Sequence, residues 1–183
     1  RRNRPAASTS AARRRRDERL MNGEAYTIAM ALYPVLLTAT MVIGALGIAV
    51  NRGGSRRLGS VMIGCQLLLL VLATYVGWPD YHLASMVIVN GLSAVPLLMA
   101  PPTPKRLQRV GAGMFLGSAL MNALFAIVEQ TPSIIALHWF SSAAIDAMMI
   151  IMLGGFCGGM VARHVADWLR AHARNPSSAG DPR

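Results

Sequence analysis

The chain has 183 residues, of which 54% are hydrophobic and only 14% are charged, and its mean hydropathy is +0.42. This composition excludes an ordinary water-soluble domain and indicates helices packed in lipid. Disordered, collagen-like and disulfide-stabilised classes are excluded as well. The net charge of +10 could indicate nucleic-acid binding, but the basic residues lie almost wholly between and beside long uncharged segments. Their positions therefore favour a signal that sets the orientation of membrane helices.

The first twenty residues contain eight of the eighteen basic residues among alanine, serine, proline and asparagine, with no apolar periodicity. We expect residues 1–20 to form a disordered basic tail. One interpretation is that the inserted native chain begins at Met21, which directly precedes the first apolar segment. The composition also overlaps that of organellar transit peptides, which is a second interpretation.

Five long segments that carry almost no charge predict an all-α integral membrane protein, a bundle of about five transmembrane helices. The predicted bundle covers residues 21–160, with spans at 26–50, 58–78, 83–100, 110–128 and 134–160. The first span would be about 37 Å long, which exceeds the roughly 30 Å of bilayer hydrocarbon. The third span ends where clustered prolines cannot continue a helix.

The pattern of apolar and polar residues at 161–174 predicts an amphipathic helix after the fifth span. Its large apolar residues fall on one face at helical spacing: Val161, Val165, Trp168 and Leu169. Asp167 and the arginines fall on another face. This helix either lies in the cytoplasmic interface or extends the fifth span. We expect residues 175–183 to form a disordered tail.

The loops differ sharply in charge, and this difference predicts the orientation. With five spans, loops 51–57 and 101–109 share one side with the C-terminal tail and together hold ten Lys and Arg, whereas the opposite loops hold none. The positive-inside rule then predicts a cytoplasmic C-terminus and an external N-terminus at Glu24. Arginine outnumbers lysine seventeen to one, as G+C-rich codons would give, so we expect a bacterial inner membrane.

The basic tail of residues 1–20 conflicts with this orientation, because it would place eight arginines outside. The conflict disappears if the native chain begins at Met21. It also disappears if the first segment fails to span and four helices remain, and the third interpretation is a genuine exception to the rule.

A shift of 52 residues aligns two similar stretches of the chain. It places Arg57, Leu58 and Gly59 on Arg109, Val110 and Gly111. Each half then reads as a basic loop, a helix, a short acidic turn and a second helix. One interpretation is a tandem hairpin repeat in parallel orientation, and the other is the chance likeness of any two membrane hairpins.

Asp146 is the acidic residue that lies deepest in a predicted span. A carboxyl there costs about 2.5–3.5 kcal/mol on insertion scales, so it should face other helices or a hydrated cavity. His138, Ser142 and Asp146 share one stripe at i, i+4 and i+8, which makes them candidates for a proton or ion pathway. His138 is expected near the outer interface as a hydrogen-bonded surface imidazole. The alternative role of Asp146 is a structural hydrogen bond to a polar residue on another span. The available partners are Gln66, Asn90 and Asn122.

Glycines at intervals of four residues predict close packing between helices. They are Gly113 and Gly117 in the fourth span and Gly154, Gly155, Gly158 and Gly159 in the fifth. Without side chains, backbones can approach and gain van der Waals contact, either within one chain or between copies. The second cluster is alternatively a hinge before the amphipathic helix. Cys65 and Cys157 have no metal-binding spacing, and we expect neither a metal site nor a disulfide.

No phosphate-binding Gly/Lys loop, GxSxG, HExxH or haem-ligating histidine pair occurs, so we expect no enzyme and no cofactor. The expected partners are the lipid bilayer and either further copies of the chain or other membrane subunits, with no specific nucleic acid. The first hypothesis is a non-catalytic membrane protein that acts as a self-associating bundle or an assembly subunit. The second is a small proton- or cation-coupled transporter or channel that uses Asp146. The third is a holin-like, lesion-forming protein.

Overall fold

The computed structural model describes residues 7–76, 82–99, 105–128 and 131–174. Within these ranges the chain forms five α-helices and no strand. In chain order they are α1 (Ala7–Val50), α2 (Ser55–Val76), α3 (His82–Leu98), α4 (Arg106–Ile127) and α5 (Pro132–Arg174). The prediction of an all-helical bundle of about five helices is confirmed.

Four helices contain segments that are long and apolar enough to cross a membrane. These segments are Ala31–Val50, Ser55–Tyr75, Arg106–Ile127 and Ser133–His172. Helix α3 is shorter, because its 17 residues extend only about 25 Å against roughly 30 Å of hydrocarbon. Large apolar side chains remain exposed on all five helices. Together with the composition, this surface suggests a membrane protein.

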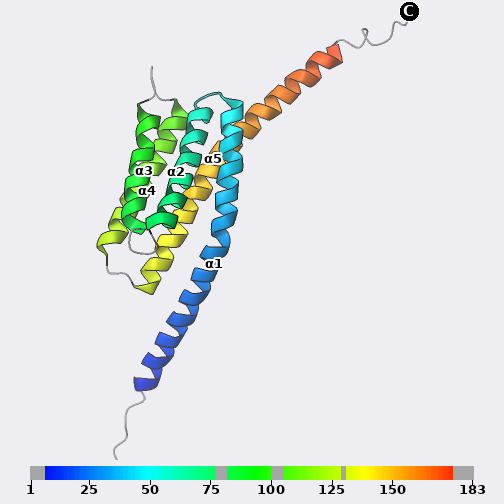
Figure 1. Cartoon of the computed structure of the whole chain (residues 1–183). Helices are drawn as coiled ribbons and strands as arrows, with labels where there is room; N and C mark the ends of the chain where they lie inside the picture. Colours follow the sequence, from blue (N-terminus) through cyan, green and yellow to red (C-terminus); the bar gives the residue numbers. More distant parts are fainter. Residues whose placement is uncertain (1–6, 77–81, 100–104, 129–130, 175–183) are drawn as a thin grey trace, which may run out of the picture.

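Basic residues gather at one end of the bundle, while the arginines at 13–19 lie on the part of α1 that projects beyond the opposite end. The C-terminal ends of α1 and α3, the N-terminal ends of α2 and α4, and the C-terminal part of α5 lie together at the end where the basic residues gather (Figure 1). The basic residues found there are Arg52, Arg56, Arg57, Lys105, Arg106 and Arg109, with Arg163 and Arg170 further along α5. We call this end of the bundle the basic end.

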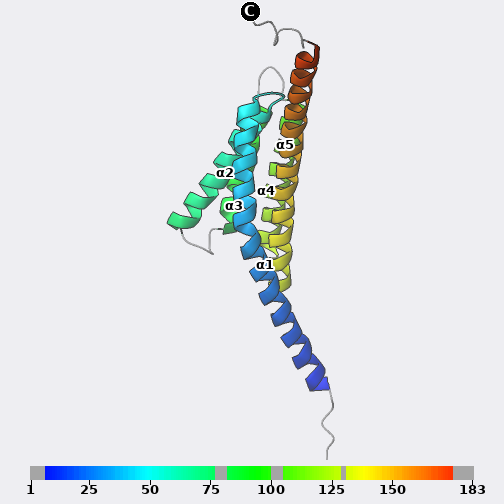
Figure 2. The same cartoon turned by 90° about the vertical axis from the view of Figure 1, so that its right-hand side faces the viewer.

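Helices α1 and α5 project beyond the other three at opposite ends of the bundle (Figures 1 and 2). Helix α1 begins at Ala7, so residues 7–20 are helical and the prediction of a disordered tail is wrong over this range. Alanine, arginine and leucine are good helix formers, and a helix that has nucleated in the apolar segment can propagate through them. Residues 1–6 and the predicted tail at 175–183 lie outside the described residues.

Helix α5 continues without a break from the predicted fifth span into the amphipathic segment. Of the two interpretations of residues 161–174, the structure has the one in which they extend the span. The glycines at 154–159 do not interrupt the helix, because a backbone hydrogen-bonded on both sides tolerates glycine at a cost of about 1 kcal/mol per residue.

The turn between α1 and α2 depends on its glycines. Gly53 and Gly54 have φ angles of +56° and +91°, and Asn51 has +48°. Glycine adopts this left-handed region without steric cost, and asparagine tolerates it better than most residues. The Ser55 hydroxyl accepts a hydrogen bond from the backbone N–H of Arg52 at 3.1 Å and closes the turn. The turn therefore reverses the chain within four residues.

Glycines also allow α1 and α2 to pack at very short distance. A Cβ on Gly59 would collide with the carbonyl oxygen of Gly44, and a Cβ on Gly44 would lie 2.7 Å from Ile63 Cγ1. Similarly, a Cβ on Gly111 of α4 would lie 2.5 Å from Leu58 Cδ1 of α2. The contact between Gly44 and Gly59 brings backbone against backbone, and the other two let a side chain pack on a bare backbone, which is how apolar helices gain van der Waals energy in lipid.

The six glycines predicted to pack helices mostly do not do so within the chain. A Cβ on Gly154 would lie 3.4 Å from Ile43 Cδ1 of α1, which is an ordinary van der Waals distance. A Cβ on any of the other five would meet nothing within 4 Å: Gly113, Gly117, Gly155, Gly158 and Gly159. The GxxxG spacing defines one face of a helix but not the direction in which that face points, so the prediction is wrong for these five as intrachain contacts.

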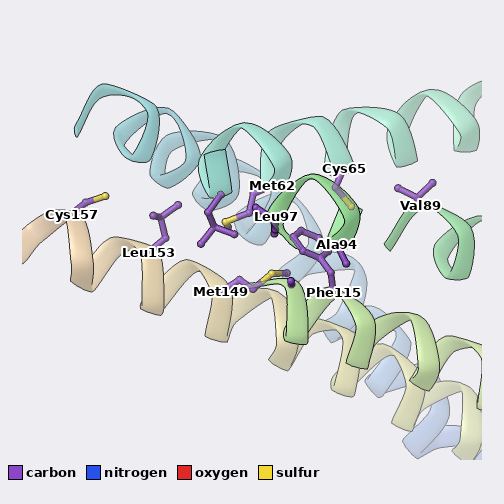
Figure 3. Packing of buried hydrophobic residues seen from close by; sticks show 11 residues of the cluster. Met62, Cys65, Val89, Ala94, Leu97, Phe115, Met149, Leu153 and Cys157 are labelled. Carbon is purple, nitrogen blue, oxygen red and sulfur yellow. The ribbon is translucent and has the colours of Figure 1, made fainter. Parts of the chain in front are cut away.

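The apolar core lies in the half of the bundle nearer the basic end. Its fully buried side chains come from α2, α3, α4 and α5, and Figure 3 shows them converging. They include Leu58, Met62, Leu97, Phe115, Met149 and Leu153. Leu58 and Met62 lie near the start of α2, and Ala94 and Leu97 lie near the end of α3, which places these core residues towards the basic end.

The glycine contact between α1 and α2 predicts a large difference between two alanine substitutions on the same helix. Gly59→Ala should destabilise the protein by about 1–3 kcal/mol, because the new Cβ has only backbone to push against. Gly64→Ala is the matched control and should be neutral or slightly stabilising, since Gly64 has open space and alanine is the better helix former. Thermal unfolding in one detergent measures both, and equal melting temperatures would contradict the contact.

Candidate functional site

A cavity of about 90 Å³ lies between the five helices. Each helix supplies polar or aromatic side chains to its wall: Tyr33 and Thr40 from α1, Cys65 and Gln66 from α2, Ser85 and Asn90 from α3, Phe115 and Ser118 from α4, and Ser142 and Asp146 from α5. A water molecule needs about 10–15 Å³ of such space, so the cavity has room for several.

The cavity occupies the half of the bundle away from the basic end. Its wall includes Ala73 near the end of α2, Ser85 near the start of α3 and Trp139 near the start of α5. Each of these three residues lies near the end of its helix that is far from the basic end. The cavity therefore occupies one half of the bundle, and the apolar core lies mainly in the other.

Access to the cavity differs between its two sides. Towards the basic end, Met62, Phe115 and Met149 form its wall, and each of them is at most 5% exposed. Elsewhere the wall includes Tyr33 and Phe140, which are 41% and 43% exposed. The core therefore closes the cavity on one side, while partly exposed side chains of α1 and α5 border it on another.

Asp146 is the acidic group of this cavity. Among the described residues that line it there is no lysine, arginine or histidine. The side-chain amide of Gln66 is a hydrogen-bonding neighbour of the Asp146 carboxyl, and Tyr33 and Cys65 lie within range of its charge. A carboxylate among apolar helices without a basic partner is costly, so it is stable only with a bound proton, a cation or water around it.

Ser142 lies one helical turn before Asp146 and also lines the cavity. Its hydroxyl oxygen is buried and has no hydrogen-bond partner within the described part of the chain. Buried hydroxyls are usually hydrogen-bonded, so the Ser142 hydroxyl is available to bind water or a ligand in the cavity. Ser142 and Asp146 together therefore present one hydroxyl and one carboxyl to any occupant.

A chain of hydrogen bonds between polar side chains joins four helices, and three of its members, Cys65, Asn90 and Ser118, also line the cavity. Asn90 accepts a hydrogen bond from the Cys65 thiol at 3.4 Å, and its amide donates to the Ser118 hydroxyl at 3.1 Å. The Asn122 amide donates to the Ser118 carbonyl oxygen at 2.7 Å. His138 Nε2 donates to Asn122 Oδ1 at 2.6 Å. We call these five residues the polar chain; it holds α2, α3, α4 and α5 in one register.

The structure separates the three residues predicted to form a pathway. Ser142 and Asp146 line the cavity, whereas His138 belongs to the polar chain. His138 is only 5% exposed and packs edge-on against the Phe125 ring at 4.9 Å, so the expectation of a surface imidazole is wrong. Its neighbours on α4 cover it, and they could not be seen from the sequence around His138.

Of the predicted partners of Asp146, Gln66 and Asn90 line the cavity and Asn122 does not. Gln66 lies beside Asp146, while Asn90 and Asn122 bond to Ser118. Ser118 was not predicted as a hydrogen-bonding residue, although its spacing of four from Asn122 places both on one face of α4. Tyr33 was not predicted either, because a tyrosine in the outer part of a span resembles an interfacial residue.

The described residues offer little for metal binding or for thiol chemistry. No group of three or more His, Cys, Asp or Glu side chains comes together within the described ranges. Cys65 and Cys157 are both buried and both free. The chemistry that the cavity offers is therefore that of a single carboxyl surrounded by neutral oxygen and aromatic groups.

Comparisons with protein-family models, with curated proteins and with solved structures found no match to this chain.

The polar chain predicts different costs for two serine-to-alanine substitutions. Ser118→Ala removes an acceptor that the Asn90 amide uses and should lower stability by about 1 kcal/mol, the usual scale for hydrogen bonds between membrane helices. Ser142→Ala removes a hydroxyl without a described partner and should change stability by less than about 0.5 kcal/mol. Thermal unfolding in lipid nanodiscs compares them, and an equal loss in both would argue against the polar chain.

Proposed function

We propose that this chain is a small membrane protein that binds a proton or a monovalent cation at Asp146 and couples that binding to transport. The observation that supports the proposal most strongly is an acid on the wall of an internal cavity in which no basic side chain is among the lining residues. The proposal corresponds to the second of the three hypotheses drawn from the sequence.

Electrostatics favours an occupant with a single positive charge. One carboxylate balances a proton or a monovalent cation, whereas a divalent ion would leave one uncompensated charge among apolar helices. The polar groups that line the cavity together with Asp146 include the Ser142 hydroxyl, the Gln66 amide and the Tyr33 hydroxyl. Oxygen donors of this kind suit hard cations and also hydrogen-bond to water that carries a proton.

A purely structural role for Asp146 explains less of the geometry. In that role Asp146 would need only its Gln66 neighbour, and helix register is already fixed by the polar chain. It would leave the buried Ser142 hydroxyl without a purpose. An occupant bound between Ser142 and Asp146 satisfies both groups at once.

The cavity is closed towards the basic end and bordered by partly exposed side chains elsewhere, which fits a transport cycle with alternating access. If the basic end is cytoplasmic, as the positive-inside rule predicts, the cavity lies in the outer half of the bundle. Transfer of the occupant inward then requires Met62, Phe115 and Met149 to separate. A rearrangement of packed helices with two discrete arrangements is the usual way in which such a barrier opens.

Neutralising Asp146 should abolish transport without disturbing the fold. Asp146→Asn keeps nearly the same shape but cannot carry the charge that holds a cation. In proteoliposomes with an internal pH dye and imposed Na⁺ or K⁺ gradients, flux through this variant should fall to the level of empty liposomes.

Asp167→Asn is the matched control, because Asp167 lies on the same helix but pairs with Arg170 at the surface, 3.2 Å away. This variant should transport as the unaltered protein does. Undiminished flux in Asp146→Asn, or no flux above background in the unaltered protein, would rule the proposal out.

A further inference from the structure

One face of α5 is turned away from the other helices and carries a regular pattern. Positions taken at alternating intervals of four and three residues from Leu137 to Leu169 are all apolar or small. We call this face the α5 seam. Its large members include Met148, Ile151, Val165 and Leu169, which are 49%, 72%, 49% and 55% exposed. The spacing is that of the contact face in left-handed helix pairs.

The α5 seam lies opposite the face that builds the cavity and the core. Ser142 and Asp146 line the cavity, and Met149 and Leu153 belong to the core. Small residues interrupt the seam at Ala144, Gly155, Gly158 and Ala162, and a Cβ on either glycine would meet nothing within 4 Å. We propose that a second copy of this chain packs along the α5 seam and that the protein is a parallel homodimer.

Lipid does not account for the whole of the seam. The Phe156 ring packs against Gly53 of the α1–α2 turn, which marks the level of the basic end. Leu169 follows thirteen residues later, about 20 Å further along the helix axis, beyond the hydrocarbon and its headgroup layer of roughly 5–8 Å. Figure 1 shows this part of α5 projecting from the bundle. Val165 and Leu169 are about half exposed there, and a protein partner is what would cover them.

Charge and size agree with a second copy as the partner. Arg163, Asp167 and Arg170 lie off the seam, so a twofold pair of α5 helices brings no like charges into opposition. The seam is about 50 Å long, and a strip about 10 Å wide gives roughly 500 Å² per copy. Two copies therefore bury about 1,000 Å², the lower bound for a specific interface. Both copies insert with one orientation, which makes the pair parallel.

Cysteine cross-linking of the full-length chain in native membranes tests the pairing. Val165→Cys and Leu169→Cys place a thiol on the seam, whereas Arg163→Cys and Asp167→Cys place one beside it on the same helix. The native cysteines are buried and are common to all four variants. Oxidation should yield a covalent dimer with the two seam variants and not with the two controls. Equal cross-linking at all four positions, or none at either seam position, would overturn the proposal.

A substitution deeper in the membrane provides an independent test. Gly155→Leu should weaken dimerisation about tenfold or more, because the added side chain holds the two backbones apart. Gly113→Leu is the control, since Gly113 has the same open space but lies on α4. Single-molecule photobleaching in liposomes at several protein-to-lipid ratios gives the dimer fraction. Monomers at every ratio, or equal dimer fractions in the two variants, would exclude the α5 seam as the interface.

Discussion

Helices surrounded by lipid gain little by burying leucine against leucine, because the lipid tails are equally apolar. Two other sources of contact energy remain, and both are present in this bundle. Backbones meet directly where glycines face each other, as Gly44 and Gly59 do between α1 and α2. Polar side chains pair where no water can satisfy them, as Asn122 and His138 do between α4 and α5. The remaining features of the structure follow from where these two kinds of contact are made.

The two kinds of contact are made in different parts of the bundle and have different roles there. Glycine contacts and the apolar core hold the half near the basic end, where Met62 and Met149 close the cavity. The polar chain fixes four helices around the cavity through the side chains of asparagine, serine and histidine. Asp146, the acid of the cavity, takes no part in these hydrogen bonds. Asp146 is thereby left with a neutral neighbour in Gln66. An acid that the fold does not neutralise is available to something that enters from outside.

The sequence predicted the number of helices and the bounds of α2, α3 and α4 closely, because uncharged segments and basic loops are local signals, whereas α1 and α5 extend well beyond the predicted spans. It predicted the stripe of Ser142 and Asp146 for the same reason, since helical spacing fixes which residues share a face. It did not predict which face turns inward. Gly155 and Gly158 point out of the bundle, while Gly59 makes the tight contact, and His138 is covered by a helix that its own neighbours do not reveal. Which face of a helix turns inward depends on its packing against segments that are distant in the sequence. The sequence of one helix alone does not determine it.

Helix α5 joins the two proposals physically, because one face carries Asp146 and the other carries the α5 seam. A helix held by a twofold partner is the natural fixed element of a dimer, so opening of the cavity would fall to the helices that pack against it. Met62 on α2 closes the cavity and would move with them, whereas Met149 on α5 would stay in place. Pairing through α5 and alternating access at Asp146 are therefore mechanically compatible within one bundle.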